Sequence, residues 1–283
     1  ECLEIDLKTL GPDHPSTATT YGNMAGVYDN QGEYEKALEW YEKGLEIELK
    51  TLGPDHPSTA TTYGNMALVY DSQGEYEKAL EWYEKGLEIE LKTLGPDHPS
   101  TATTYGNMAS VYDDQGEYEK ALEWYEKGLE IQLKTVGPDH PSTATTYSNM
   151  AMVYKHQGEY EKALEWYEKG LEIELKTLGP DHPSTATTFG NMASVYDDQG
   201  EYEKALEWYE KGLEIQLKTL GPDHPDTATT YGNMASVYDS QGEYEKALEW
   251  YEKGLEIDLK THGPEHPYVT STKENIEAVK KKM

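Results

Sequence analysis

Histidine is the residue type in this chain with the clearest capacity for chemistry, because imidazole binds metals and exchanges protons near neutral pH. One histidine recurs in each copy of the segment GPDHP. These histidines are His14, His56, His98, His140, His182 and His224. A metal site needs several ligands at short spacing, whereas one histidine every 42 residues forms a widely spaced line. We therefore expect no metal and no cofactor, and we assign these histidines to loop structure.

Carboxylates are abundant, but their spacing does not indicate catalysis. The paired aspartates lack the glycine and the ligand spacing of a calcium-binding loop. The glutamates lie on expected helix faces beside lysines, so we expect no raised carboxyl pKa values among them. The chain has neither a nucleophile elbow nor a phosphate-binding loop. We expect that it is not an enzyme.

The elements that must position these side chains follow from a repeat of 42 residues, which occurs six times. A period of this length is typical of a stacked solenoid in which each unit contacts only its neighbours. We expect the end of a truncated repeat helix, six repeats and a C-terminal capping helix. Their ranges are 1–10, 11–52, 53–94, 95–136, 137–178, 179–220, 221–262 and 263–283. The chain is expected to be the C-terminal part of a longer array.

Each repeat is expected to contain two helices, which gives an all-α fold. Glycine and proline interrupt the repeat only at GPDHP and at Gln31–Gly32. Apolar residues spaced three and four apart predict a helix over about 15–30 and a second over about 33–52. Asp13 or His14 can cap the first helix, and Gly32 suits the left-handed residue that ends it. The second stripe is expected to continue to Leu49 and Leu52, with Glu39–Lys43 and Glu46–Lys50 as ion pairs.

These residues resemble the tetratricopeptide repeat signature. Tyr28, Gln31, Gly32, Tyr34, Ala37, Tyr41, Leu45 and Ile47 carry the resemblance. The usual period is 34 residues, and the longer unit here, with HPSTATTYGNMA, is similar to the 42-residue repeats of kinesin light chains. Gly44 departs from the alanine that is usual in the second helix. The resemblance implies a right-handed α-solenoid whose first helices line a concave groove that binds peptides or another protein.

A row of asparagines lies opposite the apolar stripe of the first helix. Its members are Asn23, Asn65, Asn107, Asn149, Asn191 and Asn233. An asparagine amide both donates and accepts, so it can bond the backbone of an extended peptide of any sequence. The alternative is that each asparagine bonds a neighbouring helix or faces water. Gly22 and its equivalents lie on the same face, where they leave room for a ligand backbone or allow close helix packing.

An acidic row and two variable rows complete this face. The acidic row is Asp29, Asp71, Asp113, Asp197 and Asp239, interrupted by Lys155. Attraction for a basic ligand and solubility are both open explanations of its charge. The variable rows are Gly26, Leu68, Ser110, Met152, Ser194 and Ser236, and Asn30, Ser72, Asp114, His156, Asp198 and Ser240. Selectivity for ligand side chains and drift at tolerant sites both explain this variation.

The net charge of −30 and the absence of arginine exclude nucleic acid and anionic membranes as expected partners. A basic or mixed polar–apolar peptide or protein is the partner that this field would attract. The single cysteine, Cys2, favours an intracellular, cytoplasmic setting. The main alternative is a structural array or spacer that self-associates head to tail through Leu3, Ile5, Leu7 and Leu10. A third is the recognition part of a larger enzyme or signalling protein.

Overall fold

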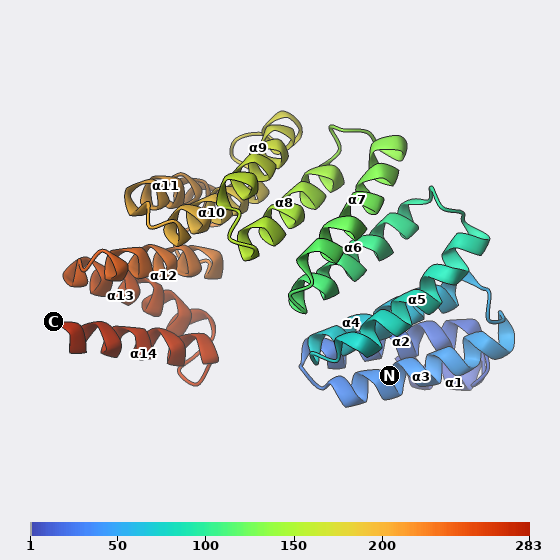
Figure 1. The fold of residues 1–283 in the computed structure, drawn as a ribbon. Coiled ribbons are helices and arrows are strands. Elements are labelled where there is room, and N and C mark those ends of the chain that lie inside the picture. Colours follow the sequence, from blue (N-terminus) through green and yellow to red (C-terminus); the bar gives the residue numbers. More distant parts are fainter. Residues whose placement is uncertain (1) are drawn as a thin grey trace. The chain divides into compact units, whose positions relative to one another are not determined.

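The chain is entirely helical over residues 2–283, the part that the structure describes. A computed structural model places fourteen helices and no strand in this range (Figure 1). They are α1 (Cys2–Thr9), α2 (Pro15–Asn30), α3 (Tyr34–Thr51), α4 (Pro57–Ser72), α5 (Tyr76–Thr93), α6 (Pro99–Asp114), α7 (Tyr118–Thr135), α8 (Pro141–His156), α9 (Tyr160–Thr177), α10 (Pro183–Asp198), α11 (Tyr202–Thr219), α12 (Pro225–Ser240), α13 (Tyr244–Thr261) and α14 (Pro267–Lys282). The expected all-α solenoid of helix-turn-helix repeats is confirmed. None of these described helices is both long enough and apolar enough to cross a membrane.

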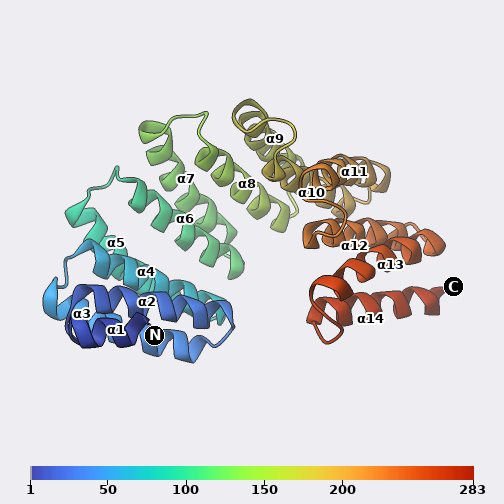
Figure 2. The same ribbon diagram turned by 180° about the vertical axis from the view of Figure 1, so that it is seen from behind.

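The helices form two compact units, Glu1–Pro138 and Asp139–Met283. Inside each unit, a first helix packs against the second helix of its own repeat. Each second helix also packs against the first helix of the following repeat, as Figure 2 shows for α12, α13 and α14. This stacking brings residues about one repeat apart in the sequence side by side.

The segment GPDHP starts each first helix. The N-terminal cap of α2 is His14, whose Nδ1 accepts a hydrogen bond of 3.1 Å from the amide of Ser16. Pro15 follows in the first turn, where a missing amide hydrogen costs no bond. Thr17 is fully buried and donates its hydroxyl to the carbonyl of Gly11 at 2.9 Å. The expected capping and loop role of this histidine is confirmed.

Gly32 ends the first helix in the expected way. Its φ of +72° lies in the left-handed region that glycine adopts without strain. The amide of Glu33 donates to the carbonyl of Tyr28 at 2.9 Å, which satisfies a carbonyl at the helix end. The turn between the two helices is therefore determined locally by Gln31 and Gly32.

Each section of the core is built from two repeats. In one section, Ala79, Tyr83 and Leu87 of one repeat pack with Met108 and Val111 of the next. The extension of the second apolar stripe to Leu49 is wrong, because Leu49 is 39% exposed whereas Ile47 and Glu48 are buried. The cause is the following repeat, which covers the side of α3 that carries Glu48.

Gly44 permits the closest contact between the two helices of a repeat. A Cβ atom at this position would lie 3.1 Å from the carbonyl oxygen of Ala18, tighter than most packed atoms allow. This close approach accounts for glycine in place of the alanine that is usual in the repeat signature that the sequence resembles.

The two expected ion pairs have different outcomes in the first repeat. Lys43 Nζ lies 2.7 Å from Glu39 Oε1, which confirms the first pair. The pair Glu46–Lys50 is wrong there, because Lys50 Nζ lies 2.5 Å from Asp13 Oδ2. The loop before α2 brings that aspartate within reach of the end of α3. Exposed pairs of this kind contribute about 0–1 kcal/mol each.

Candidate functional site

Three hollows open on the surface formed by the first helices of consecutive repeats. Their volumes are about 510 Å³ between α2 and α4, 460 Å³ between α10 and α12, and 420 Å³ between α12 and α14. The second helix in between supplies a tyrosine and an acid or amide side chain to the back of each hollow. These pairs are Tyr41 with Glu48, Tyr209 with Gln216, and Tyr251 with Asp258. The first hollow belongs to one unit and the other two to the second, and we call this surface of each unit its first-helix face.

The asparagine row lines these hollows. Asn23 and Asn65 share the first hollow, Asn191 and Asn233 share the second, and Asn233 also borders the third. Asn107 and Asn149 occupy the equivalent places on α6 and α8. Within residues 2–283, no side-chain amide of the row bonds another protein group. Of the alternatives considered above, bonding to a neighbouring helix is therefore not seen, and the amides are available to a ligand or to water.

The glycine row leaves open space beside the asparagines. A Cβ atom on Gly64, Gly106, Gly190 or Gly232 would meet nothing within 4 Å, leaving aside the chain neighbours and the backbone of its own helix. Close packing between helices, one of the two explanations considered above, is therefore excluded at these positions. At these four positions the side of the groove is therefore lower by one methyl group than it would be with alanine.

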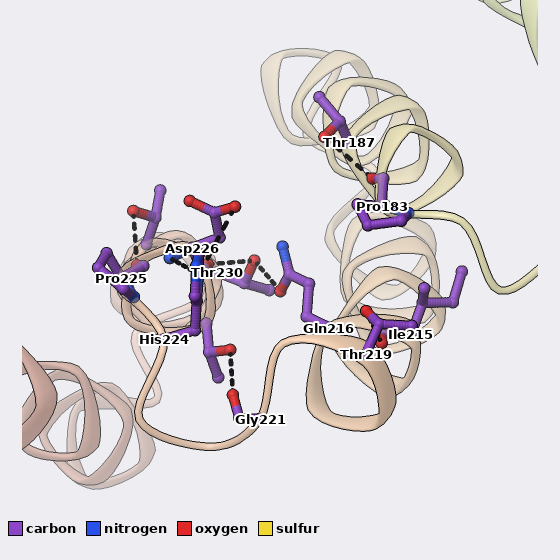
Figure 3. A network of polar contacts seen from close by, with 12 residues as sticks. Pro183, Thr187, Ile215, Gln216, Thr219, Gly221, His224, Pro225, Asp226 and Thr230 are labelled. Atoms are coloured by element: carbon purple, nitrogen blue, oxygen red, sulfur yellow. Dashed lines mark hydrogen bonds and ion pairs between the residues drawn. The ribbon is translucent and has the colours of Figure 1, made fainter.

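A threonine–acceptor pair closes the back of the first two hollows. Thr62 donates its hydroxyl to Glu48 Oε2 at 2.8 Å, and Thr230 donates to Gln216 Oε1 at 2.8 Å. Figure 3 shows the latter bond beside the capping His224 and Asp226. These residues were not among the expected site residues. A signal was present in the sequence, because the acceptor position varies only among Glu, Gln and Asp.

The expectation that glutamates keep ordinary pKa values is wrong for this acceptor position. Burial raises the pKa of Glu48, Glu90 and Glu174, while the bond from the threonine hydroxyl and a nearby histidine oppose the shift. These carboxyls lie between a second helix and the next first helix rather than on an exposed face. Asp258 behaves in the same way, with burial as the leading cause.

The first variable row lies directly in front of the buried tyrosines. Leu68 and Met152 are 43% and 38% exposed, so both offer apolar surface to a ligand. Ser110 and Ser194 instead hydrogen-bond the tyrosines behind them, Tyr125 and Tyr209. The hydroxyl of Tyr83, behind Leu68, is buried without a partner. A serine in this row therefore offers a partner to the tyrosine hydroxyl, which Leu68 does not offer to Tyr83.

The second variable row is exposed in every repeat. Asn30 donates its amide to the carbonyl of Gly26 at 2.8 Å, which ties the end of α2 to its own preceding turn. His156 is exposed at the end of α8 and has an interaction partner. Variation here changes the charge at the edge of the first-helix face, and does not disturb the core.

The acidic row is half-buried rather than a fully solvated rim. Burial, and secondarily Asp114, raises the pKa of Asp71 to about 6. Burial also raises the pKa of Asp29 and Asp197. Solubility alone does not explain carboxyls that lose part of their hydration on folding, because desolvation disfavours their charged form. Asp113 is likewise half-buried on α6 and has an interaction partner.

Two lysines reach aspartates across neighbouring repeats on this face. Lys155 donates to Ser194 Oγ at 2.6 Å and lies 3.2 Å from Asp198. Lys282, at the end of α14, donates to Asp239 Oδ2 at 2.6 Å. The expected site residues of α10 and α12 therefore line one continuous surface with Lys155. Asp113 belongs to the first unit and His156 to the second.

The comparisons with known proteins agree with this architecture. The tetratricopeptide repeat family model matches residues 1–50, 23–91, 74–134, 100–173, 142–218 and 198–260. No curated protein matches the sequence. Among solved structures, the chain is similar to nearly identical TPR-like repeats assigned to a kinesin light chain of Podosopora anserina. That similarity has 32% identity and a TM-score of 0.61, and it covers 73% of this chain and 98% of the other.

Two more distant structures share the fold. BtubC (BKLC) from P. vanneervenii is 22% identical with a TM-score of 0.63, covering 88% of this chain and 94% of its own. The STAND signal transduction ATPase PH0952 of Pyrococcus horikoshii, which has a tetratricopeptide repeat sensor, is 20% identical with a TM-score of 0.69. That match covers 93% of this chain and 38% of the ATPase. The expected resemblance to repeats of the kinesin light chain type is confirmed.

Proposed function

The chain belongs to the tetratricopeptide repeat family, and we propose that its first-helix face binds an extended peptide or an extended segment of another protein. Proteins of this family generally mediate protein–protein interactions and are generally not enzymes. We infer the same for this chain: it serves as an interaction scaffold and does not catalyse a reaction.

The observation that supports this proposal most strongly is the state of the asparagine amides. Asn191 and Asn233 line one hollow and neither side chain bonds another group of residues 2–283. An extended peptide presents a donor and an acceptor at every residue, which an amide can match at both of its atoms. Gly190 and Gly232 leave space beside the asparagines for the peptide backbone. Affinity from this row would be independent of the ligand sequence.

Selectivity would come from the residues that differ between repeats. Leu68 and Met152 offer apolar contacts, whereas Asp71 and Asp197 offer negative charge. With a net charge of −30, the chain attracts basic segments and repels nucleic acid and anionic lipid. We therefore assign a basic or mixed polar–apolar segment as the ligand. The chain has no lysine or arginine at Gly22, Asn23 or Gly26 to hold an acidic one.

Panning of a random peptide library against the whole chain tests this function. The test variant combines Asn191→Ala with Asn233→Ala, which removes both amides from one hollow. The matched control combines Glu210→Ala with Glu214→Ala, two exposed positions of α11. We expect peptides that bind the unchanged chain and the control, and that bind the test variant about tenfold less tightly. Equal binding to all three proteins would contradict recognition by the asparagines.

A salt titration separates the contribution of charge from that of the amides. We expect the affinity of a basic peptide to fall as the salt concentration rises from about 50 to about 500 mM. Added salt shortens the Debye length and so screens the attraction between the peptide and the acidic row. An affinity that does not change over this range would exclude a role for the acidic row.

Self-association is a second candidate, and one observation favours it. Ile5, Leu10 and Val27 are 55%, 45% and 56% exposed near the N-terminal end, although Val69, the equivalent of Val27, is fully buried by a preceding repeat. A second copy of the chain could cover this end by stacking head to tail. Sedimentation equilibrium over a range of concentrations tests this candidate. If the chain associates through this end, the control variant Val27→Asp should associate less. A chain that is monomeric at every concentration would exclude self-association.

A further inference from the structure

The threonine–acceptor pair is open at the C-terminal end of the second unit. In the pairs that are closed, the threonine of a first helix donates its hydroxyl to the acceptor residue 14 positions before it, at 2.6 to 2.8 Å. These pairs are Thr20–Asp6, Thr62–Glu48, Thr104–Glu90, Thr188–Glu174 and Thr230–Gln216. Thr272 of α14 and Asp258 of α13 stand at the same positions. Within residues 2–283, however, neither of their side chains forms a hydrogen bond.

The carboxylate of Asp258 is buried and has no partner. The residue is 8% exposed, and no ion pair within residues 2–283 reaches it. The shorter side chain of aspartate does not explain the open pair, because Asp6 accepts from Thr20 at 2.6 Å. Burial raises the pKa of Asp258, and the nearby imidazoles of His262 and His266 oppose this shift only in part. A buried carboxylate without a hydrogen-bond donor is costly, so this place favours a ligand that donates.

This carboxylate lies at the back of a hollow that a ligand can enter. The third hollow, between α12 and α14, has a volume of about 420 Å³, and Asp258 lines it together with Tyr251, Thr272 and Tyr268. Among the described residues that line the hollow, none carries a positive charge. The negative charge of Asp258 therefore faces a space that its own chain leaves without a counter-charge.

Tyr268 adds an aromatic ring at this hollow, where the other repeats have a small side chain. The equivalent position holds serine in five repeats and Asp226 in the sixth. The ring of Tyr268 packs edge-on against His266 and His262, with centroid distances of 4.9 and 5.7 Å. The two imidazoles stack on each other at 4.3 Å. This contact of three rings holds Tyr268 in place while the residue stays 61% exposed.

A buried carboxylate and an exposed aromatic ring are the two groups that together recognise a guanidinium group. A guanidinium group donates through a planar fork that matches a carboxylate, and its face stacks on aromatic rings. The ammonium group of lysine is a compact charge that is more strongly hydrated, so it loses more on entering a hollow. Within residues 2–283 no three metal-ligating side chains come together, so these groups favour an organic cation over a metal ion.

We propose that the third hollow is a subsite of the first-helix face for the guanidinium group of an arginine side chain, which donates to Asp258 and stacks on Tyr268. This subsite rests on the proposed binding of a peptide, and specifies one residue of that peptide. The hydroxyl of Thr272 accepts a further hydrogen bond from the same group. The first two hollows lack this role, because Thr62 and Thr230 already occupy their acceptors.

Binding of a single blocked amino acid to the unchanged protein tests the subsite without any selected peptide. The carboxyl carbon of Asp258 is followed by NMR of labelled aspartate, and its signal is assigned with Asp258→Asn. The probes are arginine, lysine and citrulline, each acetylated at its α-amino group and methylamidated at its carboxyl group. Citrulline has nearly the shape of arginine without the charge. We expect a saturable shift with the arginine probe, a weaker one with lysine and none with citrulline. Equal shifts with all three probes, or none with arginine, would overturn the subsite.

Two variants and a matched control give the second test, with the ring carbons of labelled Tyr268 as the signal where Asp258 is changed. Asp258→Asn should abolish the response to the arginine probe, and Gln216 shows that this position accepts a neutral amide. Glu252→Gln removes the same charge from an exposed position of α13 and should keep the response. Tyr268→Ser restores the residue of most other repeats and should weaken binding of the arginine probe about fivefold. An unchanged affinity in Asp258→Asn would contradict the role of the carboxylate.

The two tests distinguish the subsite from the proposed function. A response to the arginine probe without any enriched peptide would retain the subsite and reject peptide binding. Enriched peptides without arginine, bound equally by the Asp258→Asn and Glu252→Gln variants, would retain peptide binding and reject the subsite.

Discussion

The carbonyl oxygen of Ala60 lies 3.1 Å from the place that a Cβ atom on Gly86 would occupy, whereas a Cβ atom on Gly64 would meet nothing within 4 Å. Both glycines are helical and belong to the same repeat. One is therefore needed for packing, and the other is open toward the first-helix face.

Alanine substitutions at these two glycines should have opposite effects on stability. Gly64→Ala should raise the free energy of unfolding by about 0.5–1 kcal/mol, because alanine restricts the unfolded chain and favours a helix. Gly86→Ala should lower it by about 1–3 kcal/mol, because the methyl group forces the two helices apart. Urea unfolding of both variants checks this prediction. A change of the same sign in both would contradict the geometry.

Asp71→Asn should stabilise the chain near neutral pH. The ordinary pKa of an aspartate is 3.8, and that of Asp71 is raised to about 6 in the folded chain. The folded chain therefore binds the proton of this carboxyl more tightly than the unfolded chain does. Stability from this group is complete below pH about 4 and is lost as the pH rises through about 6. Asparagine does not ionise, so the variant keeps this stability at neutral pH. After allowance for solvent screening, the free energy of unfolding should rise by about 1 kcal/mol.

Urea unfolding at pH 7 and at pH 4 checks this prediction, with Asp55→Asn in an exposed loop as the control. The gain should be present at pH 7 and absent at pH 4. A gain of equal size at both values would show that it does not come from the charge of Asp71.

The acceptor position of the second helix allows a reciprocal test. Burial raises the pKa of Glu90 despite the hydrogen bond from Thr104. Stability from this carboxyl is complete in acid and is lost as the pH rises through its folded pKa. Glu90→Gln should therefore stabilise the chain at neutral pH and leave it unchanged in acid.

The reverse change at the equivalent position, Gln216→Glu, should destabilise at neutral pH only. Thr230 donates to Gln216 in the structure and can donate to the carboxylate in the variant. Thermal unfolding at several pH values checks both variants. A pH-independent effect in either would indicate packing rather than ionisation as the cause.

Removal of a tyrosine hydroxyl should depend on the residue in front of it. Tyr83 has a buried hydroxyl without a partner, so Tyr83→Phe should be neutral or stabilise by up to about 1 kcal/mol. Tyr209 hydrogen-bonds Ser194, so Tyr209→Phe should cost about 1 kcal/mol. Chemical denaturation of the two variants compares them directly. Equal losses would contradict the difference between the two sites.

The local structure of this chain was predictable because it depends on short segments. His14 and Gly32 mark the ends of α2 through bonds to residues no more than five positions away. The asparagine row followed from the helical period alone, which places every third or fourth residue on one side. Repetition strengthened each of these predictions, since the same pattern had to suit six copies.

The environment of the polar side chains could not be predicted in the same way. The burial of Glu48 and the exposure of Leu49 depend on which side of α3 the following repeat covers. The reach of Lys50 to Asp13 depends on the approach of a loop 37 residues away in the sequence. Each of these contacts joins segments whose distance and angle arise from packing between helices.

The sequence by itself determined the helices, their ends and the residues that share the first-helix face, because these follow from backbone geometry and side-chain period. Only the tertiary structure decided what each of those residues meets. Asp239 meets Lys282, and Lys155 meets Ser194. The physical reason is stacking, which brings together residues that are 43 and 39 positions apart in the sequence.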